Sequence, residues 1–153
     1  MEELSKRIEA CIAVERASAE IYNNFSNKFP KARLFFQELS KDEESHVTLL
    51  MVGKAYHKVG KLPDNVVPSS LPDIYVTLDL TEKIKQKIDS EEISLKEALD
   101  IASLLENSMA ESYLQEIMMK QTDDKVIANL KKMLIDEISH SEKIKDFMEN
   151  MGL

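Results

Sequence analysis

The sequence of 153 residues has no tryptophan, one cysteine, three glycines and four prolines. A single cysteine cannot form an internal disulfide, so the chain does not have the composition of a disulfide-rich secreted domain. No run of about 18 apolar residues is present, and the first residues lack the apolar segment of a secretory signal. We therefore expect a cytoplasmic protein that does not enter a membrane.

The scarcity of glycine and proline also leaves long stretches without helix breakers. These stretches are rich in Leu, Ile, Met, Lys and Glu, whose unbranched side chains lose little rotamer freedom in a helix. A chain of 153 residues fits one domain with a single core. We therefore predict an all-α protein whose single domain spans residues 1–153.

Positive charge is in the minority, with 20 Lys and Arg against 28 Asp and Glu, which gives a formal net charge of −8. Nucleic acids are bound largely through Lys and Arg that neutralise phosphates, so this balance argues against a nucleic-acid partner. An acidic protein instead attracts cations. The charge balance therefore favours a protein that binds metal ions.

The pattern Asp-Glu-x-Ser-His occurs twice, at residues 42–46 and 136–140. The Glu and the His of each copy are three residues apart, so on a helix they lie on one face with about 4.5 Å of rise between them. A carboxylate and an imidazole on one face form half of a metal site. The four candidate ligands are Glu43, His46, Glu137 and His140.

Two further glutamates repeat in the same way. Glu15 is followed seven residues later by Tyr22, and Glu106 is followed seven residues later by Tyr113. Each of these glutamates lies about thirty residues before one Glu-x-x-His pair. The chain therefore has the pattern of a duplicated helical hairpin, with a lone Glu on the first helix of each half.

Apolar residues at helical spacing predict four long helices. The connection at residues 61–94 holds three of the four prolines, is too long for a tight hairpin loop, and contains a short helix predicted at residues 81–88. All six candidate ligands lie within the apolar stripes, so they should meet inside a four-helix bundle with one long crossover. The predicted helices span residues 3–27, 31–59, 94–120 and 123–150.

Charge determines the expected occupant of such a site. Four buried carboxylates carry −4 and two neutral imidazoles carry none, so two divalent cations would balance them. Ligands rich in oxygen, with one nitrogen for each ion, suit iron better than zinc or calcium. We predict two iron ions, with manganese or a mixed pair as the alternatives.

These motifs in this order resemble the ligand set of the ferritin-like diiron carboxylate superfamily, and most closely the four-helix-bundle domain of the rubrerythrins. The resemblance covers roughly residues 3–150 apart from the crossover, and it implies an up-down-down-up bundle. It also implies that Glu15 and Glu106 are terminal ligands. The remaining implied ligands are the catalytic bridging pair Glu43 and Glu137, and one histidine for each metal, His46 and His140.

The resemblance implies supporting residues as well. Asp42 and Asp136, each directly before a bridging Glu, would hold the second nitrogen of a ligand histidine on the facing helix. Tyr22 and Tyr113 would donate hydrogen bonds to ligand carboxylates. Without the resemblance, the two tyrosines would be equally well explained as ordinary core residues.

The chain departs from the standard rubrerythrin pattern in two places. Met109 stands where those proteins have an additional Glu, three residues after the one that corresponds to Glu106, and this bears on ligand switching between redox states. A single cysteine also excludes a four-cysteine rubredoxin module. Electrons must then come from a separate donor protein such as a rubredoxin.

The function expected from these features is reduction of hydrogen peroxide, or of dioxygen, at a buried diiron centre in a homodimer. One alternative is a ferritin-like ferroxidase that stores iron in a hollow shell. Another is a carrier or structural metal-binding module without turnover. A miniature ferritin is disfavoured because such proteins bind metal between subunits, and ribonucleotide reductase is disfavoured by the short chain.

Overall fold

The computed structural model describes residues 2–108, 123–133 and 140–153. Within these ranges every regular element is helical and no strand occurs, which confirms the predicted all-α class. None of the helices in the described ranges combines the length and the low charge needed to span a bilayer.

The first two helices form an antiparallel pair. Helix α1 (Glu2–Lys28) is followed by a single 3₁₀ turn, η1 (Pro30–Ala32), and by α2 (Arg33–Lys58). Pro30 suits the first position of the turn because its missing N–H would have no helical partner there. Helix α1 buries an apolar stripe at helical spacing, which consists of Leu4, Ile8, Cys11, Ile12, Ala19, Tyr22 and Phe25.

The crossover contains a much longer helix than predicted. After a 3₁₀ turn, η2 (Asp64–Val66), helix α3 spans Leu71–Ser90 instead of the expected residues 81–88. The Ser70 side chain caps its N-terminus by accepting a hydrogen bond from Asp73 N at 3.3 Å. Proline in the first turn of α3 is compatible with a helix, so the proline content of this segment concealed the start of α3.

Helix α4 (Leu95–Glu106) begins as predicted, with the Ser94 side chain accepting a hydrogen bond from Glu97 N. The predicted helix 94–120 is interrupted after Glu106, because Asn107 and Ser108 are not helical. The rest of its predicted range, residues 109–120, lies outside the described part of the chain. The side-chain Nδ2 of Asn107 donates to Ser103 O at 2.9 Å and so competes with the next turn of helix.

The fourth predicted helix is represented by α6 (Lys125–Met133) and α7 (His140–Met151). Asp124 caps α6, since its Oδ1 accepts hydrogen bonds from Val126 N and Ile127 N. Residues 134–139, between the two helices, lie outside the described part of the chain.

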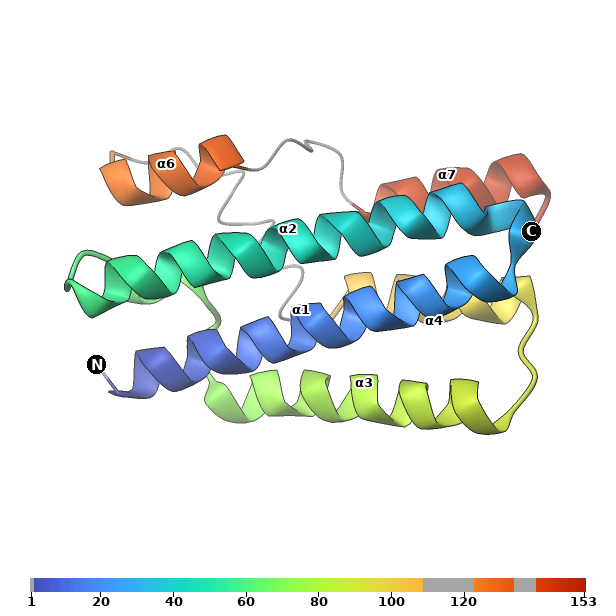
Figure 1. The fold of residues 1–153 in the computed structure, drawn as a ribbon, viewed down its shortest axis with the longest axis horizontal. Helices are drawn as coiled ribbons and strands as arrows, with labels where there is room; N and C mark the ends of the chain where they lie inside the picture. Colours follow the sequence, from blue (N-terminus) through green and yellow to red (C-terminus); the bar gives the residue numbers. More distant parts are fainter. Residues whose placement is uncertain (1, 109–122, 134–139) are drawn as a thin grey trace.

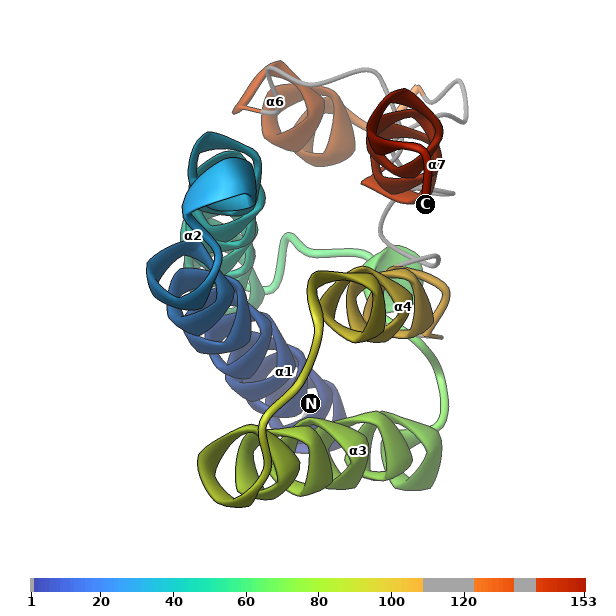
Figure 2. The ribbon, with the colours of Figure 1, turned by 90° about the vertical axis from the view of Figure 1, so that its right-hand side faces the viewer.

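The helix directions agree with an up-down-down-up bundle. In Figure 1, α2 runs against α1, α4 runs in the direction of α2, and α7 runs in the direction of α1. Figure 2 shows α3 below α1 and α4, on the side away from α6 and α7. Helix α3 packs along α1 and returns the chain to the end from which α4 starts.

Two apolar clusters fill most of the interior. The first gathers the N-terminal half of α1, residues of α2 and the start of the crossover, and includes Ile8, Val14, Leu50, Val67 and Ile74. The second gathers the C-terminal half of α1 with the start of α2 and with α3, α4 and α7, and includes Tyr22, Phe25, Phe36, Leu99 and Ile144. Along α1 the two clusters are separated by one helical turn that contains the buried polar residues Glu15 and Ser18. We call the level of this turn in the bundle the polar layer.

Candidate metal centre

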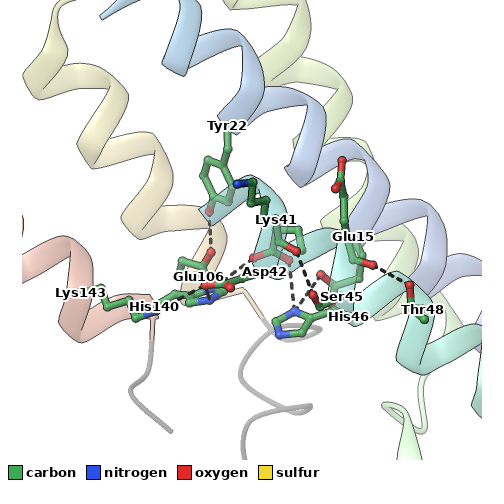
Figure 3. A network of polar contacts seen from close by, with 12 residues as sticks. Glu15, Tyr22, Lys41, Asp42, Ser45, His46, Thr48, Glu106, His140 and Lys143 are labelled. Carbon is green, nitrogen blue, oxygen red and sulfur yellow. Dashed lines mark hydrogen bonds and ion pairs between the residues drawn. The ribbon is translucent and has the colours of Figure 1, made fainter. Parts of the chain in front are cut away.

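Five buried side chains meet in the polar layer between the two apolar clusters. They come from four helices, and their exposed fractions range from 0 to 9%. Figure 3 shows how the labelled members approach one another. They are Glu15 of α1, Glu43 and His46 of α2, Glu106 at the end of α4, and His140 at the start of α7.

Glu43 lies at the centre of this group and is fully buried. One of its oxygens, Oε2, is 3.4 Å from His46 Nδ1, and the other, Oε1, is 3.1 Å from His140 Nδ1. The two imidazole rings lie nearly parallel, with centroids 5.6 Å apart. A single carboxylate therefore faces both histidines.

Each histidine also faces a second glutamate. His46 Nδ1 is 3.4 Å from Glu15 Oε2, and His140 Nδ1 is 3.1 Å from Glu106 Oε2. The result is two triads that share Glu43, and within each triad the candidate ligand atoms lie within 4.8 Å of one another. The structure thus brings together five of the six ligands that the sequence suggested.

The sixth candidate ligand, Glu137, lies outside the described residues, as do Asp136, Tyr113 and Met109. The other two expected supporting residues are described. Tyr22 Oη donates to Glu106 Oε1 at 2.6 Å, and the Nε2 of His140 is 3.0 Å from Asp42 Oδ2. Both contacts join residues from the two halves of the chain.

Contacts that the sequence did not suggest hold the end of α4 against the start of α7. Ser141 Oγ donates to Asn107 Oδ1 at 3.3 Å, directly beside the contact between His140 and Glu106. The adjacent pairs therefore fix both helix ends at the polar layer.

Lys143 is a further residue that the sequence reasoning missed. Its Nζ lies 3.4 Å from Asp42 Oδ2, the same oxygen that faces His140. Lys143 follows His140 by three residues, and this helical spacing is the signal that could have identified it.

The electrostatics of the group follow from burial and from the facing charges. Burial, followed by the charge of Glu43, raises the pKa of Glu15 from 4.5 to about 8. Burial alone would lower the pKa of the histidines, but Glu15 beside His46 and Asp42 beside His140 outweigh it, so both pKa values are raised. In the metal-free protein, the group therefore holds protons near neutral pH.

Two carboxylates have pKa values that are lowered. Burial acts to raise the pKa of Glu106, but hydrogen bonds from His140 and then Tyr22 outweigh it, so this pKa is lowered. Burial also acts to raise the pKa of Asp42, and contact with His140 and Lys143 lowers it overall. These two groups remain acceptors that orient His140.

The donor set fits divalent cations with mixed oxygen and nitrogen preference. Three buried carboxylates carry −3 when they are ionised, which is more charge than one divalent ion can balance. Both histidines present Nδ1 to the carboxylates, and His140 has Asp42 at its other nitrogen, as metal-ligating histidines commonly do. The five residues could therefore hold metal ions.

A comparison with protein-family models gives a match to the model named Rubrerythrin over residues 6–148. The chain belongs to the rubrerythrin family. The matched range includes all six candidate ligands and nearly the whole chain. Comparisons with the curated proteins and with the solved structures gave no match.

Membership in the rubrerythrin family agrees with both the fold and the buried group. The described helices form an all-α, ferritin-like arrangement, and carboxylates and histidines that could bind metal lie at its centre. The resemblance drawn from the sequence motifs is thereby confirmed at the level of the family.

Proposed function

We propose that this rubrerythrin-family protein reduces hydrogen peroxide at a pair of iron ions held between α1, α2, α4 and α7. The observation that carries the proposal is the pair of triads that share Glu43. Two ligand groups joined by one carboxylate suit two neighbouring ions better than one ion.

Each candidate ligand has a role that agrees with its position. Glu43 would bridge the two ions, because its two oxygens face different histidines. Glu137, in the equivalent sequence position, would be the second bridge. The terminal ligands would be Glu15 with His46 for one ion and Glu106 with His140 for the other.

A pair of reduced iron ions would supply one electron each, so that one hydrogen peroxide accepts two electrons and two protons and gives two water molecules. The chain's own residues orient and enclose this chemistry. Tyr22 holds Glu106 through its hydroxyl, and Asp42 holds His140 at Nε2. The apolar clusters on both sides limit access of bulk water, which strengthens electrostatic interactions within the layer.

Several partners follow from this proposal. Electrons would come from a separate donor protein such as a rubredoxin, since the chain has one cysteine. Dioxygen would be the alternative oxidant, and manganese the alternative metal. We further propose a cytoplasmic homodimer as the working form.

The test is a stopped-flow measurement of peroxide consumption by the reduced, iron-loaded protein. Wild type should bind two iron ions per chain and be oxidised rapidly, whereas Glu43→Ala and His140→Ala should slow oxidation at least about 100-fold. Glu44→Ala is the matched control, because Glu44 neighbours Glu43 on α2 but is exposed.

Two results would contradict the proposal. One is oxidation of the Glu43→Ala protein at the wild-type rate. The other is iron uptake far beyond two ions per chain in a large hollow assembly, which would support iron storage instead. Analytical ultracentrifugation with metal analysis measures the second outcome.

A further inference from the structure

Ser18 is a buried polar residue for which the proposed metal ligation has no role. Its side chain is 1% exposed, and its Oγ has no hydrogen-bond partner among the residues the structure describes. A buried hydroxyl without a partner costs free energy, and most buried polar groups are therefore paired. Ser18 also lies in the seam of α1, where an apolar residue would be expected.

Helical spacing directs Ser18 toward the polar layer. Ser18 follows Glu15 by three residues and precedes Tyr22 by four, so the three share one face, with about 4.5 and 6 Å of rise between them. Glu15 reaches His46 of α2, and Tyr22 reaches Glu106 of α4. The face between Glu15 and Tyr22 is thus directed toward the shared metal centre (Figure 3).

Other buried serines in the same pair of helices donate to backbone carbonyl oxygens. Ser26, also on α1 and also 1% exposed, donates to Asn23 O at 2.7 Å. Ser40 of α2 donates to Ala19 O at 2.9 Å. Ser18 differs from both because its hydroxyl remains available in the layer that holds the candidate ligands.

We propose that the Ser18 hydroxyl donates a hydrogen bond to a small anionic or peroxidic ligand that enters the metal centre beside Glu15. A hydroxyl rotates freely and can follow such a ligand, and a buried hydrogen bond to an anion is stronger than one in water. This inference rests on the proposed metal pair. It adds a residue that selects and orients the oxidant.

The second repeat of the sequence lacks an equivalent hydroxyl. The residue that corresponds to Ser18 in the second repeat, three positions after Glu106, is Met109. A thioether cannot donate a hydrogen bond. By its sequence, only the first repeat offers a hydroxyl donor at this position.

Azide is a suitable probe, because it is a small anion and its binding to oxidised iron can be followed by absorption. The iron-loaded wild type and the Ser18→Ala variant are titrated with azide after metal content has been measured. The expected result is a Kd for azide about tenfold higher in Ser18→Ala, with two iron ions per chain in both proteins. Ser26→Ala, which removes a buried hydroxyl already bonded to Asn23 O, should leave the Kd unchanged.

The outcomes separate this inference from the function on which it rests. Fewer than two iron ions in the wild type would overturn both. Two iron ions with the same azide Kd in wild type and Ser18→Ala would overturn the role of Ser18 alone. Loss of iron from Ser18→Ala would also overturn it, because the hydroxyl would then support the ligand carboxylates.

Discussion

Asp42 and His140 are 98 positions apart in the sequence, yet Asp42 Oδ2 lies 3.0 Å from His140 Nε2. The contact leaves His140 Nδ1 facing Glu43 and Glu106. It thereby connects the first half of the chain to the ligand that the second half contributes. The side chain of Asp42 is 27% exposed, whereas that of His140 is 4% exposed.

Replacing Asp42 with Asn should weaken metal binding without removing a ligand. The amide keeps the shape but loses the charge that favours one ring orientation, and such outer partners typically change metal affinity by about 10- to 100-fold. Competition with a chelator for Fe²⁺ or Co²⁺ measures the effect. Glu44→Gln, an exposed change nearby on α2, is the control. Equal affinities for wild type and Asp42→Asn would show that the contact is dispensable.

Replacing Tyr22 with Phe should lower the free energy of unfolding of the metal-free protein by about 1.5–3 kcal/mol, the range for a hydrogen bond to a charged group. The hydroxyl donates to the buried Glu106 carboxylate at 2.6 Å, and Phe leaves that oxygen unsatisfied. Urea denaturation measures the change. Tyr75→Phe on α3, where the ring is 50% exposed, should have little effect. A Tyr22→Phe protein as stable as wild type would contradict this prediction.

Metal binding should release protons, and metal affinity should rise as the pH increases through about 8. In the metal-free protein, the pKa of Glu15 is raised to about 8 and that of His46 is raised as well, so both groups carry protons at pH 7. A cation must displace these protons before it can bind. Increasing pH through the pKa of Glu15 removes the proton of that carboxyl and with it one part of the competition. Titration with Zn²⁺ or Co²⁺ in weakly buffered solution with a pH indicator measures the proton release. Metal binding without proton release at pH 7 would contradict this prediction.

Replacing Ser70 with Ala should destabilise the protein by about 1 kcal/mol, because it removes the side chain that caps α3. Thermal or urea unfolding measures the change. Ser90→Ala tests the opposite end of the same helix, where the hydroxyl donates to Gln86 O and caps no N–H group. Equal stabilities for Ser70→Ala and Ser90→Ala would show that the cap contributes little.

The helical class and the grouping of five candidate ligands were predictable because both depend on local spacing. Glu43 and His46 share a face of α2 whatever the rest of the chain does. Glu15 and Glu106 attracted attention because a charged residue interrupts an apolar stripe. The duplication then indicated that the two halves contribute equivalent residues to one place.

The helix boundaries were less predictable because they depend on competition between local contacts. The end of α4 depends on the Asn107 side chain, which bonds back to Ser103 O. The length of α3 was missed because proline at its first turn was interpreted as a helix breaker. Lys143 was missed although it follows His140 by three residues, because its partner Asp42 lies on another helix, α2.

The division of the interior by a charged layer offers a route to engineering. Ile8 in one apolar cluster and Phe25 in the other are 17 residues apart on α1, about 25 Å of helix. Substitutions so far apart, with no shared neighbours, usually change the free energy of unfolding additively. Each cluster can therefore be repacked for thermal robustness on its own, and the gains combined, while the chemistry between them is left untouched.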